Sequence, residues 1–117
     1  MIVRLTHLLL QVRDLDTAER FYLGVLGFAI RDRGTLRDGR PLVVLHQGLG
    51  LTVFPAGASP GDRTIDHVAF RVEALQPFID RLAAAGLPYE GPVATAAYGT
   101  SIYVADPEGN RVELHDR

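Results

Sequence analysis

Two segments of this chain, residues 5–12 and residues 65–72, are dominated by apolar residues interspersed with single polar ones. Successive side chains of a β-strand point to opposite faces, so this pattern predicts a strand in each segment. The two segments also resemble each other residue by residue. His7 near the start of the first corresponds to His67 near the start of the second. We therefore expect one structural unit of about half the chain, used twice.

A stretch with helical spacing follows each strand. In the first half, apolar residues recur at intervals of three and four as far as Leu26, and Gly27 is expected to end the helix. In the second half, Leu75 opens a similar stripe that ends at Gly86. Residues 91–100 predict a loop of small residues. Further short strands are expected at residues 28–31, 42–46 and 51–54, and then near Tyr89 and at residues 101–104 and 111–115.

Each half therefore has the order βαβββ, which predicts an α+β fold. We assign residues 1–55 to the first module and residues 65–117 to the second. Residues 56–64 are assigned to a linker, because proline and glycine interrupt both helix and strand there. Together the two modules are expected to form one domain.

Composition narrows the functional classes. A hydrophobic fraction of 47% is typical of a soluble globular protein, and a net charge of −2 offers nothing to attract nucleic acid or an anionic membrane. The absence of cysteine excludes disulfides and thiolate ligands. No apolar run reaches the length of a membrane-spanning helix. We expect a cytoplasmic protein with a small-molecule substrate and no nucleic-acid or membrane partner.

One carboxylate stands out in the last predicted strand. Glu113 lies between Val112 and Leu114, and burying a charge between core residues is costly unless it has a partner. If the mixed faces of the two modules pack together, His7 and His67 can converge on Glu113. Two imidazoles and a carboxylate suit one divalent metal ion: Fe(II), Zn, Ni or Mn. Each residue alone is compatible with a structural role, but the repeated histidine favours a metal site.

With these motifs in view, the chain resembles the vicinal oxygen chelate superfamily, which includes glyoxalase I, bleomycin-resistance proteins, fosfomycin-resistance enzymes and extradiol dioxygenases. The resemblance implies that His7, His67 and Glu113 bind the metal. It also implies that paired βαβββ modules form a U-shaped mixed sheet around the metal, with helices on the outer face, and that the protein is a homodimer. The most specific segments are residues 6–8, 18–28, 66–70 and 103–113.

The chain also departs from each subfamily. Aligning residues 48–52 with residues 109–113 places Thr52 where glyoxalase I has a fourth ligand, a glutamate or glutamine. Leu9 stands where fosfomycin thiol transferases carry threonine, and residues 91–100 contain neither their lysine nor the histidine of extradiol dioxygenases. Bleomycin-binding members lack the metal ligands, whereas this chain has all three.

Other polar residues are expected near the same site. His115 lies two residues after Glu113 on the same strand face and is a candidate general base; Tyr103 is the second candidate catalytic residue. Each of the two also has a structural alternative, an exposed residue near the end of the chain or a core tyrosine. The residues expected to contact a substrate are Gln11, Thr52, Arg71 and Ser101.

These observations predict a metal-dependent lyase or isomerase of the glyoxalase type, acting on a small molecule that chelates the metal through neighbouring oxygens. One alternative is an extradiol-type dioxygenase or a fosfomycin-type resistance enzyme. Another is a module that binds a drug or metabolite without turnover.

Overall fold

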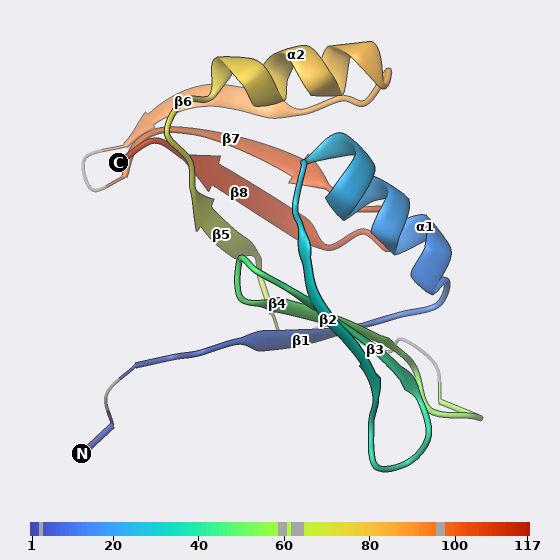
Figure 1. Ribbon diagram of the computed structural model, residues 1–117. Helices are drawn as coiled ribbons and strands as arrows, with labels where there is room; N and C mark the ends of the chain where they lie inside the picture. Colours follow the sequence, from blue (N-terminus) through green and yellow to red (C-terminus); the bar gives the residue numbers. More distant parts are fainter. Residues whose placement is uncertain (3, 59–60, 62–64, 96–97) are drawn as a thin grey trace.

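The elements of the computed structural model repeat the same order twice (Figure 1). The structure describes residues 1–2, 4–58, 61, 65–95 and 98–117. The first half contains β1 (Leu8–Val12), α1 (Leu15–Glu19), a π-helical segment η1 (Arg20–Val25), β2 (Ile30–Thr35), β3 (Pro41–Leu45) and β4 (Leu49–Val53). The second half contains β5 (Val68–Arg71), α2 (Gln76–Ala84), β6 (Glu90–Thr95), β7 (Gly99–Ala105) and β8 (Arg111–His115). The predicted βαβββ modules and the α+β class are confirmed.

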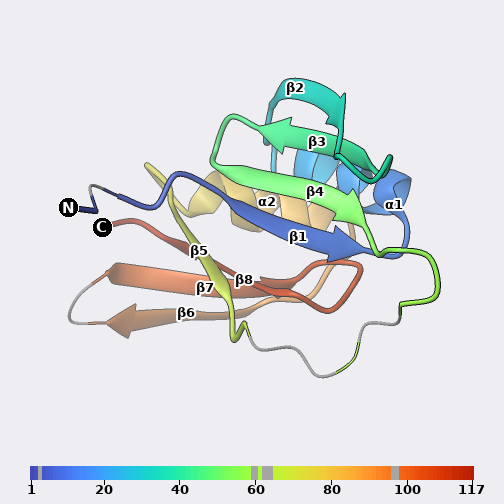
Figure 2. The same cartoon turned by 90° about the horizontal axis from the view of Figure 1, so that it is seen from below.

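The eight strands form two mixed four-stranded sheets, in the orders β1-β4-β3-β2 and β5-β8-β7-β6. In each sheet the first strand pairs in parallel with the last, and the remaining pairs are antiparallel. Figure 2 shows the two sheets as separate layers of strands. Across the described ranges no strand ladder joins them, so β1 and β5 are each left with one unpaired edge.

One apolar core lies between the sheets and the helices. The face of β1 that carries Leu10 and Val12 is buried, as the alternation predicted, and Val112 and Leu114 of β8 are buried in the same cluster. Helix residues fill the space between them, with Tyr22 and Leu82 fully enclosed. The helices therefore cover one face of each sheet and leave the face with the repeat histidines to solvent.

Both helices begin where the local chemistry favours it. Asp14 caps α1, because its carboxylate accepts hydrogen bonds from the backbone N–H and the hydroxyl of Thr17. This hydrogen bonding keeps the pKa of Asp14 below its usual value. In α2, Pro77 lies in the first turn, where the proline nitrogen has no intrahelical partner to lose.

Residues 91–100 correct one prediction, because this segment was expected to be a loop. β6 runs through it as far as Thr95 and pairs with β7. The Gly91-Pro92 pair lies within a register shift of that ladder, between Glu90 and Val93. Proline is tolerated in β6 because this strand lies at the edge of its sheet, where one row of backbone groups needs no partner.

A tight turn between β7 and β8 connects the second module to the first. Asp106 is buried and accepts hydrogen bonds from the backbone N–H of Glu108 and from both the backbone and the side-chain amide of Asn110. It also accepts one from the hydroxyl of Tyr22, at 2.7 Å. The carboxylate of Glu108 in turn binds Arg13, just after β1. The turn therefore holds the two modules in one arrangement.

Only part of the predicted linker can be compared with the structure. Of residues 56–64, the structure describes 56–58 and 61, so the module boundary stays a prediction. Neither helix in the described ranges has the length and apolar character needed to cross a bilayer.

Candidate metal centre

The second sheet brings one histidine and the buried glutamate together. β5 and β8 run in parallel with Ala69 beside Glu113, so that His67 just before β5 reaches back to the carboxylate. His67 Nε2 lies 3.1 Å from Glu113 Oε1. The Glu113 side chain is only 6% exposed, whereas the His67 side chain is 35% exposed. The predicted pair is therefore formed at the rim of the sheet, with the carboxylate inside and the imidazole reaching solvent.

Ser101 accounts for the burial of Glu113. Its hydroxyl donates to Glu113 Oε2 at 2.8 Å, leaving Oε1 facing His67. Ser101 itself is fully buried on β7. This differs from the expectation that Ser101 contacts a substrate, because its hydroxyl is used inside the sheet. A buried carboxylate with both oxygens occupied avoids most of the cost of leaving water.

The other ring nitrogen of His67 also meets a carboxylate. Nδ1 lies 2.7 Å from Asp66 Oδ1. The hydrogen bond with His67, together with the guanidinium of Arg111 at 3.9 Å, keeps the pKa of Asp66 below its usual value, so the side chain is ionised at neutral pH. His67 is thus held between two carboxylates, one on each ring nitrogen.

Tyr103, a candidate catalytic residue, lies beside His67 and forms a wall of this centre. It lies opposite Glu113 across the β7–β8 ladder, and its ring stands edge-on to that of His67 with centroids 6.2 Å apart. Arg111 covers Tyr103, with its guanidinium carbon 4.0 Å from the ring centroid, and also pairs with Glu90 at 3.2 Å. The wall is aromatic and carries a cation on its outer side.

His7 belongs to the other sheet. It is exposed just before β1, and its Nδ1 lies 3.0 Å from the hydroxyl of Thr6. His7 and His67 both line a cavity of about 350 Å³ between the starts of β1 and β5, but Glu113 does not line it. Within the described part of the chain, no group of three or more His, Asp or Glu side chains is close enough to hold one metal ion. One chain thus forms the His67–Glu113 pair and leaves His7 apart from it.

The strand register corrects the position of the fourth ligand. Leu9 lies beside Gly50 across β1 and β4, whereas Ala69 lies beside Glu113 across β5 and β8. Leu9 and Ala69 each stand two residues after a repeat histidine. The counterpart of Glu113 in the first module is therefore Gly50, and not Thr52 as the sequence alignment placed it. Because glycine has no side chain, the first module offers no fourth ligand at this position.

Thr52 has a structural role instead. It is fully buried on β4, and its hydroxyl donates to the carbonyl oxygen of Pro41 on β3 at 2.7 Å. This differs from the expectation that Thr52 contacts a substrate. Gln11, the other first-module residue expected to do so, is exposed and accepts a hydrogen bond from Arg40 at 2.8 Å.

The two remaining candidates lie further along the second sheet. Arg71 and His115 are neighbours across β5 and β8. His115 lies on the same face as Glu113 and donates through Nδ1 to the carbonyl oxygen of Arg117 at 2.9 Å. Tyr98 packs near it, with ring centroids 5.0 Å apart.

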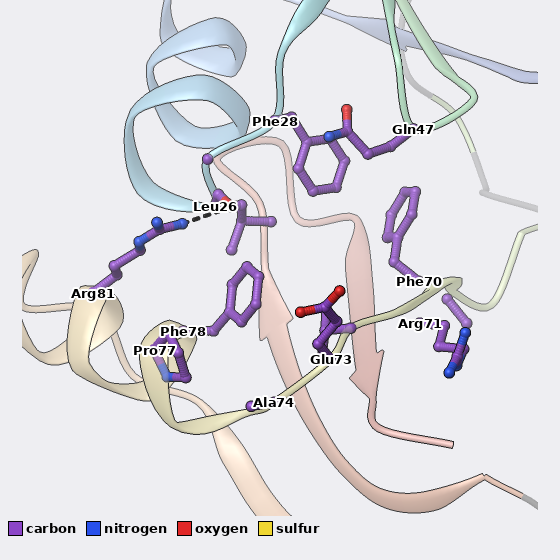
Figure 3. A pocket seen from close by; sticks show the side chains of 13 residues that line it. Leu26, Phe28, Gln47, Phe70, Arg71, Glu73, Ala74, Pro77, Phe78 and Arg81 are labelled. Atoms are coloured by element: carbon purple, nitrogen blue, oxygen red, sulfur yellow. Dashed lines mark hydrogen bonds between the residues drawn. The ribbon is translucent and has the colours of Figure 1, made fainter.

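Arg71 is exposed and lines a second cavity, of about 680 Å³. Figure 3 shows this cavity with Phe28, Phe70 and Phe78 around it. The two cavities share Gln47, Ala69 and Phe70, so they adjoin each other.

Three residues at this centre were missed by the sequence analysis. Thr6 and Asp66 each precede a repeat histidine and contact its Nδ1, and a polar residue in that place of both copies was the available signal. Gly50 was missed because the alignment of the two halves was two residues out of register at that strand.

Comparison with known proteins identifies the family and agrees with the fold. The model of the glyoxalase/bleomycin resistance protein/dioxygenase superfamily matches residues 4–114. Virulence protein STM3117 of Salmonella typhimurium is 34% identical over 97% of this chain and 84% of its own length. Glutathione transferase FosA of Serratia marcescens is 31% identical over 98% of this chain and 82% of its own length.

Solved structures agree as well. A glyoxylase/bleomycin resistance protein/dioxygenase domain from Frankia sp. EAN1pec superposes with a TM-score of 0.79 at 25% identity. The match covers 99% of this chain and 98% of that one. The paired βαβββ architecture is therefore shared along the whole chain.

Proposed function

The chain belongs to the glyoxalase/bleomycin resistance protein/dioxygenase superfamily, and on that basis we propose that it is a metal-dependent lyase or isomerase. Its substrate is a small molecule that chelates one divalent metal through neighbouring oxygens. His7, His67 and Glu113 hold the metal.

The His67–Glu113 pair carries this proposal. Two ligands of one metal ion with bonds of roughly 2.1 Å lie about 3 Å apart, and His67 Nε2 and Glu113 Oε1 are separated by 3.1 Å. An imidazole and a carboxylate also suit a divalent ion of intermediate hardness. Ser101 holds the other carboxylate oxygen, as the outer partner of a metal ligand commonly does.

A second copy of the chain supplies His7 to the pair in this proposal. β1 and β5 each have an unpaired edge, which favours pairing with another chain. Large hydrophobic side chains are exposed on or just before these strands, namely Leu5, Leu9 and Ile65. A two-fold homodimer in which β1 of one copy meets β5 of the other covers them and forms two equivalent sites.

Mixing two inactive variants tests this arrangement. His7→Ala and His67→Ala homodimers should each have low metal content, whereas a mixture refolded together should recover about half of the wild-type metal per heterodimer. In the heterodimer, one site receives His7 from one chain and His67 with Glu113 from the other. Metal analysis of the separated heterodimer measures this, and the mass comes from light scattering. No recovery in the heterodimer, or a monomeric wild type with metal bound, would contradict the shared site.

Residues around the metal site have separate roles in the proposed reaction. A divalent ion bound here supplies Lewis-acid stabilisation of negative charge on a substrate oxygen. Tyr103 and its covering Arg111 shape one wall of the site. His115 donates from Nδ1 to a backbone carbonyl, which can only accept, so its Nε2 is left to act as a base. His115 is about 7 Å along the strand from Glu113.

Gly50 restricts the reaction. Three protein ligands leave about three positions on a six-coordinate ion, and the ligand carboxylate that moves protons in a four-ligand site is missing. We expect weak or no turnover of the glutathione adduct of methylglyoxal. Gly50→Glu should raise metal affinity, because it adds a carboxylate at the position of the missing fourth ligand. The new side chain would point toward Leu9, whose flexible end lies 3.0 Å from the added Cβ and can move aside. Gly50→Ala is the matched control. Chelator competition measures the metal affinity, and initial rates with the native metal measure the turnover of the adduct. Robust wild-type turnover of that adduct would overturn this prediction.

A fosfomycin-type resistance enzyme is the second candidate, supported by the 31% identity to glutathione transferase FosA. Metal analysis of protein purified without added metal, followed by a substrate panel of 2-hydroxy-ketones, epoxides with thiol, and catechols, separates the candidates. Conversion of a 2-hydroxy-ketone supports the lyase or isomerase, and thiol addition to an epoxide supports the second candidate. Saturable binding of a ligand that is released unchanged, with or without metal, identifies a binding module instead.

A further inference from the structure

The residue before each repeat histidine contacts the same ring nitrogen. Asp66 Oδ1 lies 2.7 Å from Nδ1 of His67, and Thr6 Oγ1 lies 3.0 Å from Nδ1 of His7. The two contacts occupy equivalent places in the two modules. In both rings Nδ1 is therefore engaged by the preceding residue, and Nε2 of His67 faces Glu113 Oε1.

The two partners differ in chemistry. The Asp66 carboxylate only accepts hydrogen bonds, so Nδ1 of His67 must carry a hydrogen. Nε2, which faces Glu113 Oε1, is then the nitrogen that would bind a metal. The Thr6 hydroxyl can donate or accept, so it leaves both tautomers of His7 open. The same place in the repeat thus selects one tautomer in the second module and none in the first.

Asp66 is itself paired with the guanidinium of Arg111. Its Oδ1 lies 3.9 Å from Arg111, which stacks on Tyr103 and pairs with Glu90. The Asp66 side chain is 82% exposed, so it adds little to the core. Its contacts with the described residues lead to His67 and to Arg111 in the wall of the centre.

We propose that Asp66 is a positioning residue that orients His67 and selects its metal-binding tautomer, which makes His67 the firm ligand and His7 the exchangeable one. The inference rests on the proposed metal function. Carboxylates that hold a ligating histidine in this way commonly affect metal affinity by roughly 10–100-fold.

Zinc affinity, measured by competition with a chelator, tests the inference. Asp66→Ala should weaken zinc binding about 10–100-fold, and Asp66→Asn, which keeps an acceptor oxygen, should recover part of the loss. Thr6→Val should cost less than Asp66→Ala. Glu90→Gln is the matched control, because it removes one negative charge beside Arg111 without touching His67. Affinity within twofold of this control for Asp66→Ala would overturn the inference.

An NMR measurement distinguishes an effect of Asp66 on the orientation of His67 from an effect of the Asp66 charge. In zinc-loaded protein with ¹⁵N-labelled histidine, NMR should show a slowly exchanging Nδ1–H on His67 in the wild type and in Asp66→Asn. The signal should be lost by exchange in Asp66→Ala. An equally protected Nδ1–H in Asp66→Ala would overturn the inference while leaving the metal site intact. If His67→Ala bound zinc as tightly as the wild type, the proposed metal site would fail, and the inference with it.

Discussion

Replacing Glu113 with alanine is expected to lower the affinity for a divalent metal by more than the roughly 100-fold typical of a lost outer partner, and to abolish metal-dependent turnover. Glu113 is the one anionic ligand proposed, and its Oε1 already lies 3.1 Å from His67 Nε2. Removing it takes away both a ligand and the charge that balances the ion. Metal analysis of protein purified without added metal, and chelator competition, measure the loss.

The stability of each Glu113 variant must be measured together with its metal affinity, because Glu113 is buried. Its removal leaves the Ser101 hydroxyl without its carboxylate partner, at a cost of about 1–3 kcal/mol. Glu113→Gln keeps an acceptor for Ser101 and removes only the charge, so it should fold better and still bind metal weakly. Glu90→Ala, on an exposed residue, is the control for a lost surface charge. Wild-type metal content in Glu113→Gln and in Glu113→Ala would exclude this carboxylate as a ligand.

Asp106→Ala is expected to destabilise the fold by about 3 kcal/mol or more, because one buried and three partly buried donors lose a charged acceptor together. The carboxylate accepts from the backbone N–H groups of Glu108 and Asn110, from the Asn110 amide and from the Tyr22 hydroxyl. Burial, and then the charge of Asp106, raise the pKa of Tyr22 far above its usual value, so the phenol stays a donor. Denaturant unfolding followed by circular dichroism measures the change.

Two further variants show how much of this loss of stability comes from the Tyr22 hydrogen bond and how much any lost carboxylate would cause. Tyr22→Phe should cost about 1–2 kcal/mol, since it removes one donor and leaves the turn's own hydrogen bonds in place. Asp38→Ala removes a half-exposed carboxylate whose partner is the neighbouring Arg40 and should stay within about 0.5 kcal/mol. An Asp106→Ala protein no less stable than Asp38→Ala would show that this turn does not hold the modules together.

The order of elements and the core could be read from the sequence because both depend on local periodicity. Leu10 and Val12 lie on the buried face that the alternation of β1 predicted, and Glu113 was singled out because a charge between Val112 and Leu114 needs a partner. The repeat also pairs His7 with His67 from the sequence alone. These inferences needed only neighbours along the chain.

Cross-strand register was decided by the tertiary structure. Gly50, and not Thr52, stands opposite Leu9, because backbone pairing of β1 with β4 sets that register and a two-residue shift keeps the same apolar pattern. For the same reason Ser101 was expected beside a substrate, whereas the sheet places it on Glu113.

Sequence periodicity also could not predict how the two sheets are placed relative to each other. One chain brings His67 to Glu113 within a single sheet, while His7 remains on another sheet with an unpaired edge. Strand β6 could not be recognised either, because its Gly91-Pro92 pair reads as a breaker until the strand is known to lie at an edge. Local patterns determine which residues face a pocket, but long-range strand pairing determines which of them meet.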